Sequence, residues 1–227
     1  MITTIFFDLD GTLYPEEEFV ISGFFAVSEY ISKKYKISRG KVFGILADDF
    51  KKGLRKKNFN VLLKKLGLKK ETVEKLIKIY RSHYPKEISL YPDASKTLKA
   101  LNENFKLGLI TNGYKNSQAN KISSLKIKKY FKAIFIATEF EDDNWKKSVV
   151  SFNILLKKLK SKPEETAYVG DNPKRDFMGA KKMGILSIRI KRKGGDCFNI
   201  LSGKKNKADY NISSLQSVEK IIKKNEK

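Results

Sequence analysis

Short apolar runs alternate along the chain with amphipathic segments of helical period. The amphipathic segments lie near residues 92–104, 114–126, 146–160 and 174–183. Alternation of this kind is typical of an α/β fold with a doubly wound parallel sheet. The pattern predicts strands in ITTIFF, FKLGLIT, AIFIA, TAYVG and ILSIRI, which begin at residues 2, 105, 133, 166 and 185.

One connection in this alternation is too long for an ordinary crossover. Residues 15–105 separate the first strand from the second, and residues 19–83 have the pattern of several helices. We therefore expect an inserted α-helical domain over residues 15–90, with residues 1–14 and 91–227 forming the α/β core. The stretch YPDA at residues 91–94 marks the return to the core, where Asp93 is predicted to cap the next helix.

The chain is strongly basic. It contains 48 lysines and arginines against 25 acidic residues, a formal net charge of +23, and residues 51–70 contain no acid. Such an excess attracts anionic substrates or nucleic acid, but a lysine bias spread over solvated helix faces produces the same charge. Lysines recur in most of the predicted helices without a nucleic-acid-binding motif, so we do not expect specific nucleic-acid binding.

Cysteine usage and hydropathy indicate the compartment. Cys197 is the single cysteine, which excludes an intramolecular disulfide framework. The first residues lack the regions of a signal peptide, and no apolar stretch approaches the length of a membrane span. With 227 residues and 41% hydrophobic composition, the chain can bury a substantial core. We expect a cytoplasmic protein without membrane contact; the sequence makes no prediction of its oligomeric state.

The first predicted strand ends in two carboxylates, in the stretch FFDLDGTLYP at residues 6–15. Asp8 and Asp10 are two residues apart, so on an extended strand their side chains point the same way, and Gly11 permits a turn directly after them. Carboxylates that share a small space require a neutralising cation, or one of them must hold a proton. The stretch therefore indicates a metal site, acid–base chemistry or both.

Polar residues also follow other predicted strands. The second strand ends in Thr111 and Asn112, and the fourth strand is followed by Asp171 and Asp176. Lys146 lies at the start of the helical segment that precedes the fourth strand. Ligands of doubly wound sheets bind beyond the carboxyl ends of the strands. We therefore expect carboxylates, a hydroxyl and an ammonium group to meet at one edge of the sheet.

The order of these motifs resembles that of the haloacid dehalogenase superfamily of phosphatases. The matching features are DxDGT at residues 8–12, Thr111, Lys146 and GDxxxxD at residues 170–176. The closing stretch ADYNISSLQSVEKII is similar to the last strand and helix of the family. The resemblance is to the phosphoglycolate phosphatase-like subgroup, which implies a Rossmann-like catalytic core and a helical cap formed by residues 15–90.

The resemblance also implies an activity, the Mg²⁺-dependent hydrolysis of a phosphomonoester of a small phosphorylated metabolite. Asp8 would attack phosphorus and form an aspartyl phosphate. Asp10 would protonate the leaving oxygen and then deprotonate the hydrolytic water. Thr111, Asn112 and Lys146 would bind the phosphoryl oxygens.

The same resemblance implies a metal site. Asp8, the backbone carbonyl of Asp10, and Asp171 would hold Mg²⁺ together with water. Asp176 would not bind the metal ion directly but would hold a metal-bound water or Lys146.

Three alternatives stay open at the level of the sequence. Lys147 adjoins Lys146 and the proline that usually follows the family's lysine is missing, but the spacing to Phe152 and Pro163 favours Lys146. A sugar phosphomutase of the same superfamily would keep the same motifs, although Asp10 argues against a dehalogenase. A nucleic-acid-associated basic protein would explain the charge without catalysis. The identity of the substrate is not predicted.

Overall fold

The computed structural model describes residues 1–138, 149–203 and 206–225. The chain divides into two compact units. Residues 1–16 and 89–227 form the first, called here the α/β unit, and residues 17–88 form the second, called the helical unit.

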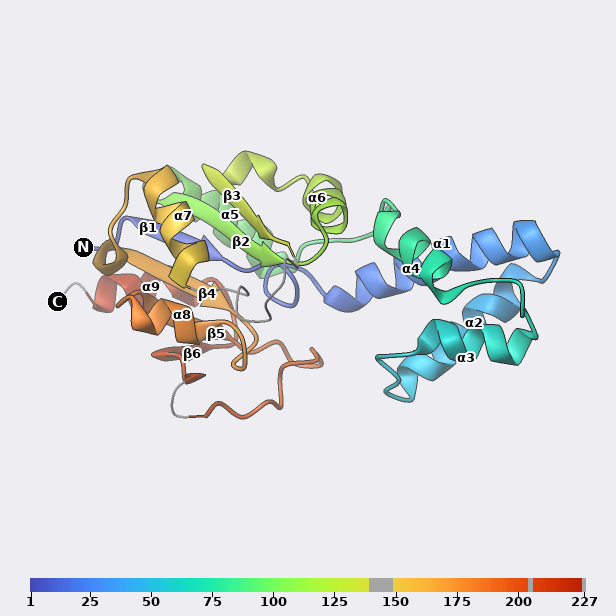
Figure 1. The fold of residues 1–227 in the computed structure, drawn as a ribbon. Coiled ribbons are helices and arrows are strands. Elements are labelled where there is room, and N and C mark those ends of the chain that lie inside the picture. The colour runs from blue at the N-terminus through green and yellow to red at the C-terminus, as the bar shows by residue number, and fades with distance from the viewer. Residues whose placement is uncertain (139–148, 204–205, 226–227) are drawn as a thin grey trace. The chain divides into compact units, whose positions relative to one another are not determined.

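The α/β unit is built on a six-stranded parallel sheet with the strand order β3-β2-β1-β4-β5-β6 (Figure 1). From the central β1 the chain builds one side of the sheet and then the other, so the connections reverse beside β1. This confirms the predicted doubly wound sheet. The strands are β1 (Thr4–Phe7), β2 (Lys106–Asn112), β3 (Ala133–Ala137), β4 (Thr166–Gly170), β5 (Leu186–Ile190) and β6 (Tyr210–Ile212).

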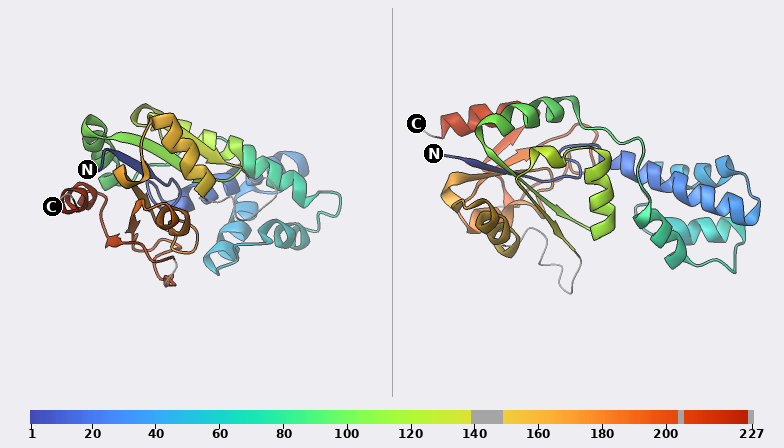
Figure 2. Two further views of the ribbon diagram at one scale, coloured as in Figure 1. Left: turned by 60° about the vertical axis from the view of Figure 1, so that its left-hand side comes forward. Right: turned by 90° about the horizontal axis from the view of Figure 1, so that it is seen from above.

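Helices cover both faces of this sheet. In the right-hand view of Figure 2, α5 and α9 lie on one face and α7 and α8 on the other. The ring of Phe152 in α7 packs against Phe6 of β1 and Tyr168 of β4, at centroid distances of 6.3 and 5.1 Å. The helices are α5 (Pro92–Asn104), α6 (Lys115–Ser124), α7 (Val149–Leu159), α8 (Phe177–Lys182) and α9 (Ser217–Lys224), with short 3₁₀ turns at Lys128–Tyr130 and Pro163–Glu165.

Asp93 does not cap α5, so that prediction is wrong. The helix begins at Pro92, and Tyr91 occupies the N-cap position without a side-chain hydrogen bond. Both carboxylate oxygens of Asp93 instead accept hydrogen bonds from Nη1 of Arg192, at 2.9 and 2.8 Å, and the backbone amide of Leu215 donates to one of them at 2.8 Å. A charge-assisted bond to a guanidinium is stronger than a neutral cap, and it draws the carboxylate toward the segment after β5.

The helical unit has its own hydrophobic core. Its helices are α1 (Glu16–Tyr35), which begins in the α/β unit, α2 (Arg39–Lys51), α3 (Asn58–Leu66) and α4 (Val73–Ser82). Each contributes an apolar face to one buried cluster that includes Phe24, Val27, Leu46, Leu62 and Leu76. Within α1, for example, the buried residues Phe24, Val27 and Ile31 recur at helical spacing, which is why the sequence pattern predicts helices here.

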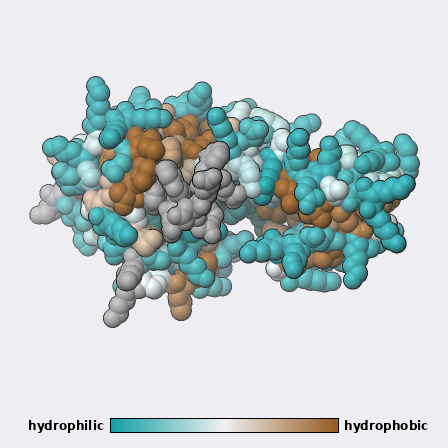
Figure 3. Space-filling view, viewed as in Figure 1, coloured by the Kyte–Doolittle hydropathy of each residue, from teal (hydrophilic) through white to brown (hydrophobic). Residues whose placement is uncertain are grey.

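Hydrophilic residues cover most of the visible face of each unit (Figure 3). Within the described part of the chain, no helix is both long enough and apolar enough to cross a membrane.

Glu71 forms a buried polar centre in the helical unit. Its carboxylate accepts hydrogen bonds from the hydroxyl of Tyr30 at 2.8 Å, from Nζ of Lys34 at 2.8 Å and from the hydroxyl of Tyr35 at 3.0 Å. The backbone amide of Thr72 donates to the other oxygen at 3.1 Å. Burial alone raises the pKa of Glu71, but these donors outweigh it and lower the pKa from 4.5 to about 2.

Acid should therefore destabilise the helical unit through Glu71. A carboxyl group with a lowered folded-state pKa stabilises the fold fully above its unfolded pKa of 4.5, and this contribution is lost as the pH falls toward about 2. We expect the melting temperature, followed by circular dichroism, to fall more steeply over this range for the wild type than for Glu71→Gln. Glu29→Gln is the matched control, because Glu29 pairs with Lys33 on the exposed surface and should change little. Identical pH profiles for Glu71→Gln and the wild type would contradict the assignment.

Candidate active site

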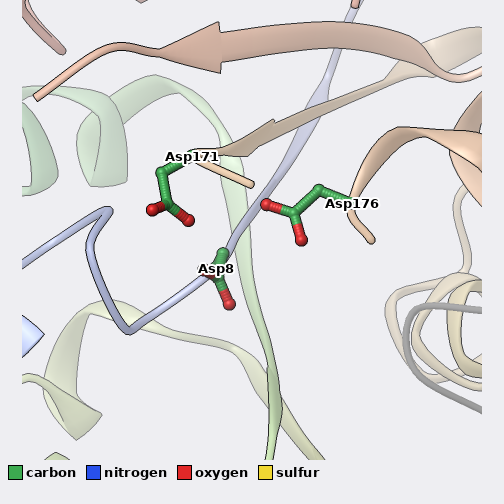
Figure 4. A group of neighbouring side chains, drawn as sticks. All are labelled: Asp8, Asp171 and Asp176. Atoms are coloured by element: carbon green, nitrogen blue, oxygen red, sulfur yellow. The ribbon is translucent and has the colours of Figure 1, made fainter. Parts of the chain in front are cut away.

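Three carboxylates meet at the carboxyl ends of β1 and β4. Asp8 directly follows β1, and its backbone amide donates to the carbonyl of Val169 at 2.9 Å, which holds the two strand ends together. Asp171 directly follows β4, and Asp176 lies at the N-cap position of α8. Among the described residues, Asp8, Asp171 and Asp176 form a group whose ligand atoms all lie within 4.8 Å of one another. Figure 4 shows the side chain of Asp176 extending toward Asp171, with Asp8 close to both.

Neighbouring groups orient two of these side chains. The hydroxyl of Thr12 donates to Oδ2 of Asp8 at 3.3 Å, and the backbone amide of Asn172 donates to Oδ2 of Asp176 at 2.8 Å. Asp8 is 4% exposed and Asp176 is fully buried. These hydrogen bonds fix the directions of the two carboxylates.

Two glycines make room for the carboxylate group. Gly11 has a φ of +71°, and a Cβ atom there would lie 2.9 Å from Cγ of Asp171. A Cβ atom at Gly170 would lie 3.0 Å from Cγ of Asp176. Both distances are too short for a side chain, so the backbone approaches these two carboxylates in a way that only glycine allows.

The ligand set fits a hard divalent cation. Three carboxylates within this distance repel one another unless a positive charge compensates them. All of the candidate ligand atoms are oxygens, and Mg²⁺ prefers a small number of carboxylates with water in the remaining positions.

Asp10 is engaged by a different set of side chains. Its Oδ1 atom lies 2.7 Å from Nζ of Lys121 and also accepts a hydrogen bond from the hydroxyl of Tyr14. Its Oδ2 atom accepts a hydrogen bond from Nε2 of Gln118 at 2.8 Å. Burial raises the pKa of Asp10, but the charge of Lys121 and the hydrogen bonds from these three side chains hold it below the ordinary value. Lys121, a residue that the sequence analysis does not single out, therefore supplies the positive charge next to Asp10.

The residues predicted to bind phosphate are described only in part. Thr111 is buried in β2, and its hydroxyl accepts a hydrogen bond from Nε2 of Gln118 at 2.5 Å. Asn112 is the last residue of β2, and the turn continues through Gly113, whose φ is +140°. Lys146 lies outside the described residues.

Gln118 and Lys121 are site residues that the sequence analysis missed. They lie three residues apart on α6, the helix that starts directly after the turn at Gly113. Residues at this spacing share one face of a helix. That spacing indicates that the two residues lie on the same side of α6, but it does not show that this side is buried against Asp10.

Comparisons with known proteins agree with this geometry. The family model described as haloacid dehalogenase-like hydrolase matches residues 5–190. A glyceraldehyde 3-phosphate phosphatase of Methanocaldococcus jannaschii is 35% identical over 235 residues, which cover 98% of each chain. The pyrophosphatase PpaX of Halalkalibacterium halodurans is 30% identical over 197 residues, or 83% of each chain.

A solved structure extends the similarity to the whole fold. The crystal structure of a HAD phosphatase from Thermococcus onnurineus is 28% identical, with a TM-score of 0.62, and the match covers 97% of this chain and 98% of the other. The family model, the relatives and the fold agree with the motif order in the sequence. The chain therefore belongs to the haloacid dehalogenase-like hydrolase family.

Proposed function

We propose that this protein is a Mg²⁺-dependent phosphomonoester hydrolase that acts on a small phosphorylated metabolite through an aspartyl phosphate on Asp8. The observation that carries the proposal is that the two aspartates at the end of β1 have different neighbours. Asp8 belongs to the carboxylate group with Asp171 and Asp176, whereas Asp10, two residues later, is paired with Lys121. This arrangement supports Asp8 as the nucleophile beside a candidate metal site and Asp10 as a separate acid–base group.

The reaction proceeds in two displacements at phosphorus. In the first, a carboxylate oxygen of Asp8 attacks and the bond from phosphorus to the leaving oxygen breaks. The leaving oxygen takes a proton from Asp10, which must first gain that proton from solvent, because, despite the burial of Asp10, Lys121 holds its pKa below the ordinary value. In the second displacement, water attacks the phosphorus of the aspartyl phosphate, and Asp10 accepts a proton from that water. The bond between phosphorus and Asp8 then breaks, which releases phosphate and restores the carboxylate.

The phosphoryl group brings its own negative charge, which the site must compensate. We assign its binding to the hydroxyl of Thr111, the backbone amide of Asn112 and, from the motif order in the sequence, the ammonium group of Lys146. In the transition state these donors would stabilise the negative charge that is spread over the phosphoryl oxygens.

Mg²⁺ would be held by the side chains of Asp8 and Asp171 and by the backbone carbonyl of Asp10, with Asp176 adjacent. The bound ion supplies positive charge to the phosphoryl oxygens. The chain's own contribution is to hold the carboxylates in a fixed arrangement.

The relatives indicate which substrates to test first. Glyceraldehyde 3-phosphate is named for the relative that is 35% identical over nearly the whole chain, and pyrophosphate for the one that is 30% identical. Since the first match is the more extensive, we expect glyceraldehyde 3-phosphate to be hydrolysed with the higher kcat/KM.

Hydrolysis of p-nitrophenyl phosphate tests the proposal directly. We expect turnover with Mg²⁺, loss of turnover on addition of EDTA, and recovery when Mg²⁺ is restored in excess. The release of phosphate from glyceraldehyde 3-phosphate and from pyrophosphate should then be compared under the same conditions. Equal rates with and without EDTA, or the absence of hydrolysis of all three compounds, would contradict the proposal.

A further inference from the structure

One face of α6 joins two parts of the candidate site. Gln118 and Lys121 are 1% and 5% exposed, although both are polar and lie on a helix next to solvent-exposed residues. The two hydrogens of the Gln118 amide serve Oδ2 of Asp10 and Oγ1 of Thr111. The end of β2 and the side chain of Asp10 are therefore parts of one hydrogen-bonded network.

The network holds both oxygens of Asp10. Lys121 and Tyr14 donate to Oδ1, and Gln118 donates to Oδ2, so the carboxylate cannot rotate without breaking at least one of these bonds. Tyr14 is fully buried and comes from the same turn as Asp10, whereas the other two donors come from α6. Anchors from two directions define the position of a side chain better than local bonds alone.

Stability is a weak explanation for this arrangement. Lysine is almost never fully buried unless it is paired, and a buried ion pair often contributes less than well-packed apolar side chains of the same volume. Well-packed apolar side chains at both position 10 and position 121 would fill the space without the cost of desolvating two charged groups. The ammonium group of Lys121 lies against the carboxylate of Asp10, to which we assign proton transfer. We therefore look for the reason for this contact in the reaction.

We infer that Lys121 is a positioning residue, which with Gln118 and Tyr14 fixes the carboxylate of Asp10 in the direction that proton transfer to the leaving oxygen requires. The inference rests on the proposed function and adds a role that no motif of the chain indicates. Proton transfer depends steeply on the distance and angle between the groups, and a misplacement of about 1 Å can cost about 100-fold in rate. Lys121 therefore acts through Asp10 and needs no contact with the substrate.

Substrates that differ in their leaving group provide the test. The nitrophenolate of p-nitrophenyl phosphate departs readily without a proton, whereas the alkoxide of glycerol phosphate needs one. Lys121→Met keeps an unbranched side chain that is one atom shorter and removes the charge. We expect Lys121→Met to lower kcat/KM for glycerol phosphate by at least about tenfold more than for the aryl phosphate, within the roughly 10²- to 10⁴-fold contribution of acid–base catalysis.

A double-mutant cycle separates positioning from structural support. If Lys121 acts through Asp10, adding Lys121→Met to Asp10→Asn should change kcat/KM by less than about twofold, because the two residues form one unit. Lys121→Arg should recover part of the lost rate. Lys115→Met is the matched control, since Lys115 is an exposed lysine at the start of the same helix, and it should behave as the wild type.

Tyr14→Phe covers the case in which Lys121→Met fails to fold. It removes one of the three donors to Asp10 with little change in shape, and it should show the same dependence on leaving group with a smaller loss. Equal losses for both substrates, together with additive effects in the cycle, would overturn the inference for Lys121.

Crystal structures of the wild type and Lys121→Met keep this inference distinct from the proposed function. If the wild type hydrolyses neither substrate, the proposed function fails, while the position of the Asp10 carboxylate still shows whether Lys121 holds it in place. A displaced or rotated carboxylate in the variant supports positioning by Lys121. An unchanged carboxylate overturns it.

Discussion

Asp8→Asn should abolish turnover while the fold stays intact. The amide has nearly the same shape as the carboxylate but cannot attack phosphorus, and it also removes one negative oxygen from the group formed with Asp171 and Asp176. The backbone amide of Asp8 keeps its bond to Val169, so the end of β1 should not move. We expect activity to fall by at least about 10⁴-fold, because nucleophile and metal site are lost together.

Steady-state kinetics with p-nitrophenyl phosphate measure this loss, and circular dichroism checks the fold. Acid-quenched wild-type protein should carry one covalent phosphoryl group by mass spectrometry during turnover, whereas Asp8→Asn should carry none. Asp48→Asn is the control, because Asp48 is an exposed aspartate of the helical unit. Substantial Mg²⁺-dependent activity in folded Asp8→Asn would show that another group is the nucleophile.

The fold could be predicted largely because its signals are local. The strand in TAYVG, for example, is a short apolar run between polar segments, and it forms β4 at Thr166–Gly170. The carboxyl ends of parallel strands lie at one edge of a sheet, so the meeting of Asp8 and Asp171 follows once the strands are assigned. The cap predicted for Asp93 fails because its partner, Arg192, lies 99 residues away in the sequence.

Lys121 could not be recognised for a similar reason. The chain has 48 basic residues, and a lysine in an amphipathic helix is ordinarily on the solvated face. What distinguishes Lys121 is its burial against Asp10, 111 residues earlier in the chain. No pattern within α6 records that contact, which depends on how the helix packs beside the end of β1.

Gly11→Ala should impair the site through Asp171, without touching any group that reacts. The new Cβ atom would overlap Oδ2 of Asp171 and lie 2.9 Å from its Cγ, so that carboxylate must move. We expect kcat to fall by about 100-fold, the scale for a displacement of about 1 Å at a reacting centre. The Mg²⁺ concentration for half-maximal activity should rise by about tenfold or more, as it does when the surroundings of a metal ligand are disturbed.

Gly184→Ala separates this crowding from backbone strain. Gly184 has a φ of +74°, close to the +71° of Gly11, but a Cβ atom there would meet nothing within 4 Å. Both variants therefore carry the cost of a left-handed alanine, about 1–2 kcal/mol, and both should melt at a lower temperature. Loss of activity and a raised Mg²⁺ requirement in Gly11→Ala alone would trace the defect to Asp171. Similar kinetics for the two variants would mean that Asp171 relaxes at no cost, and that its position beside Gly11 does not limit the reaction.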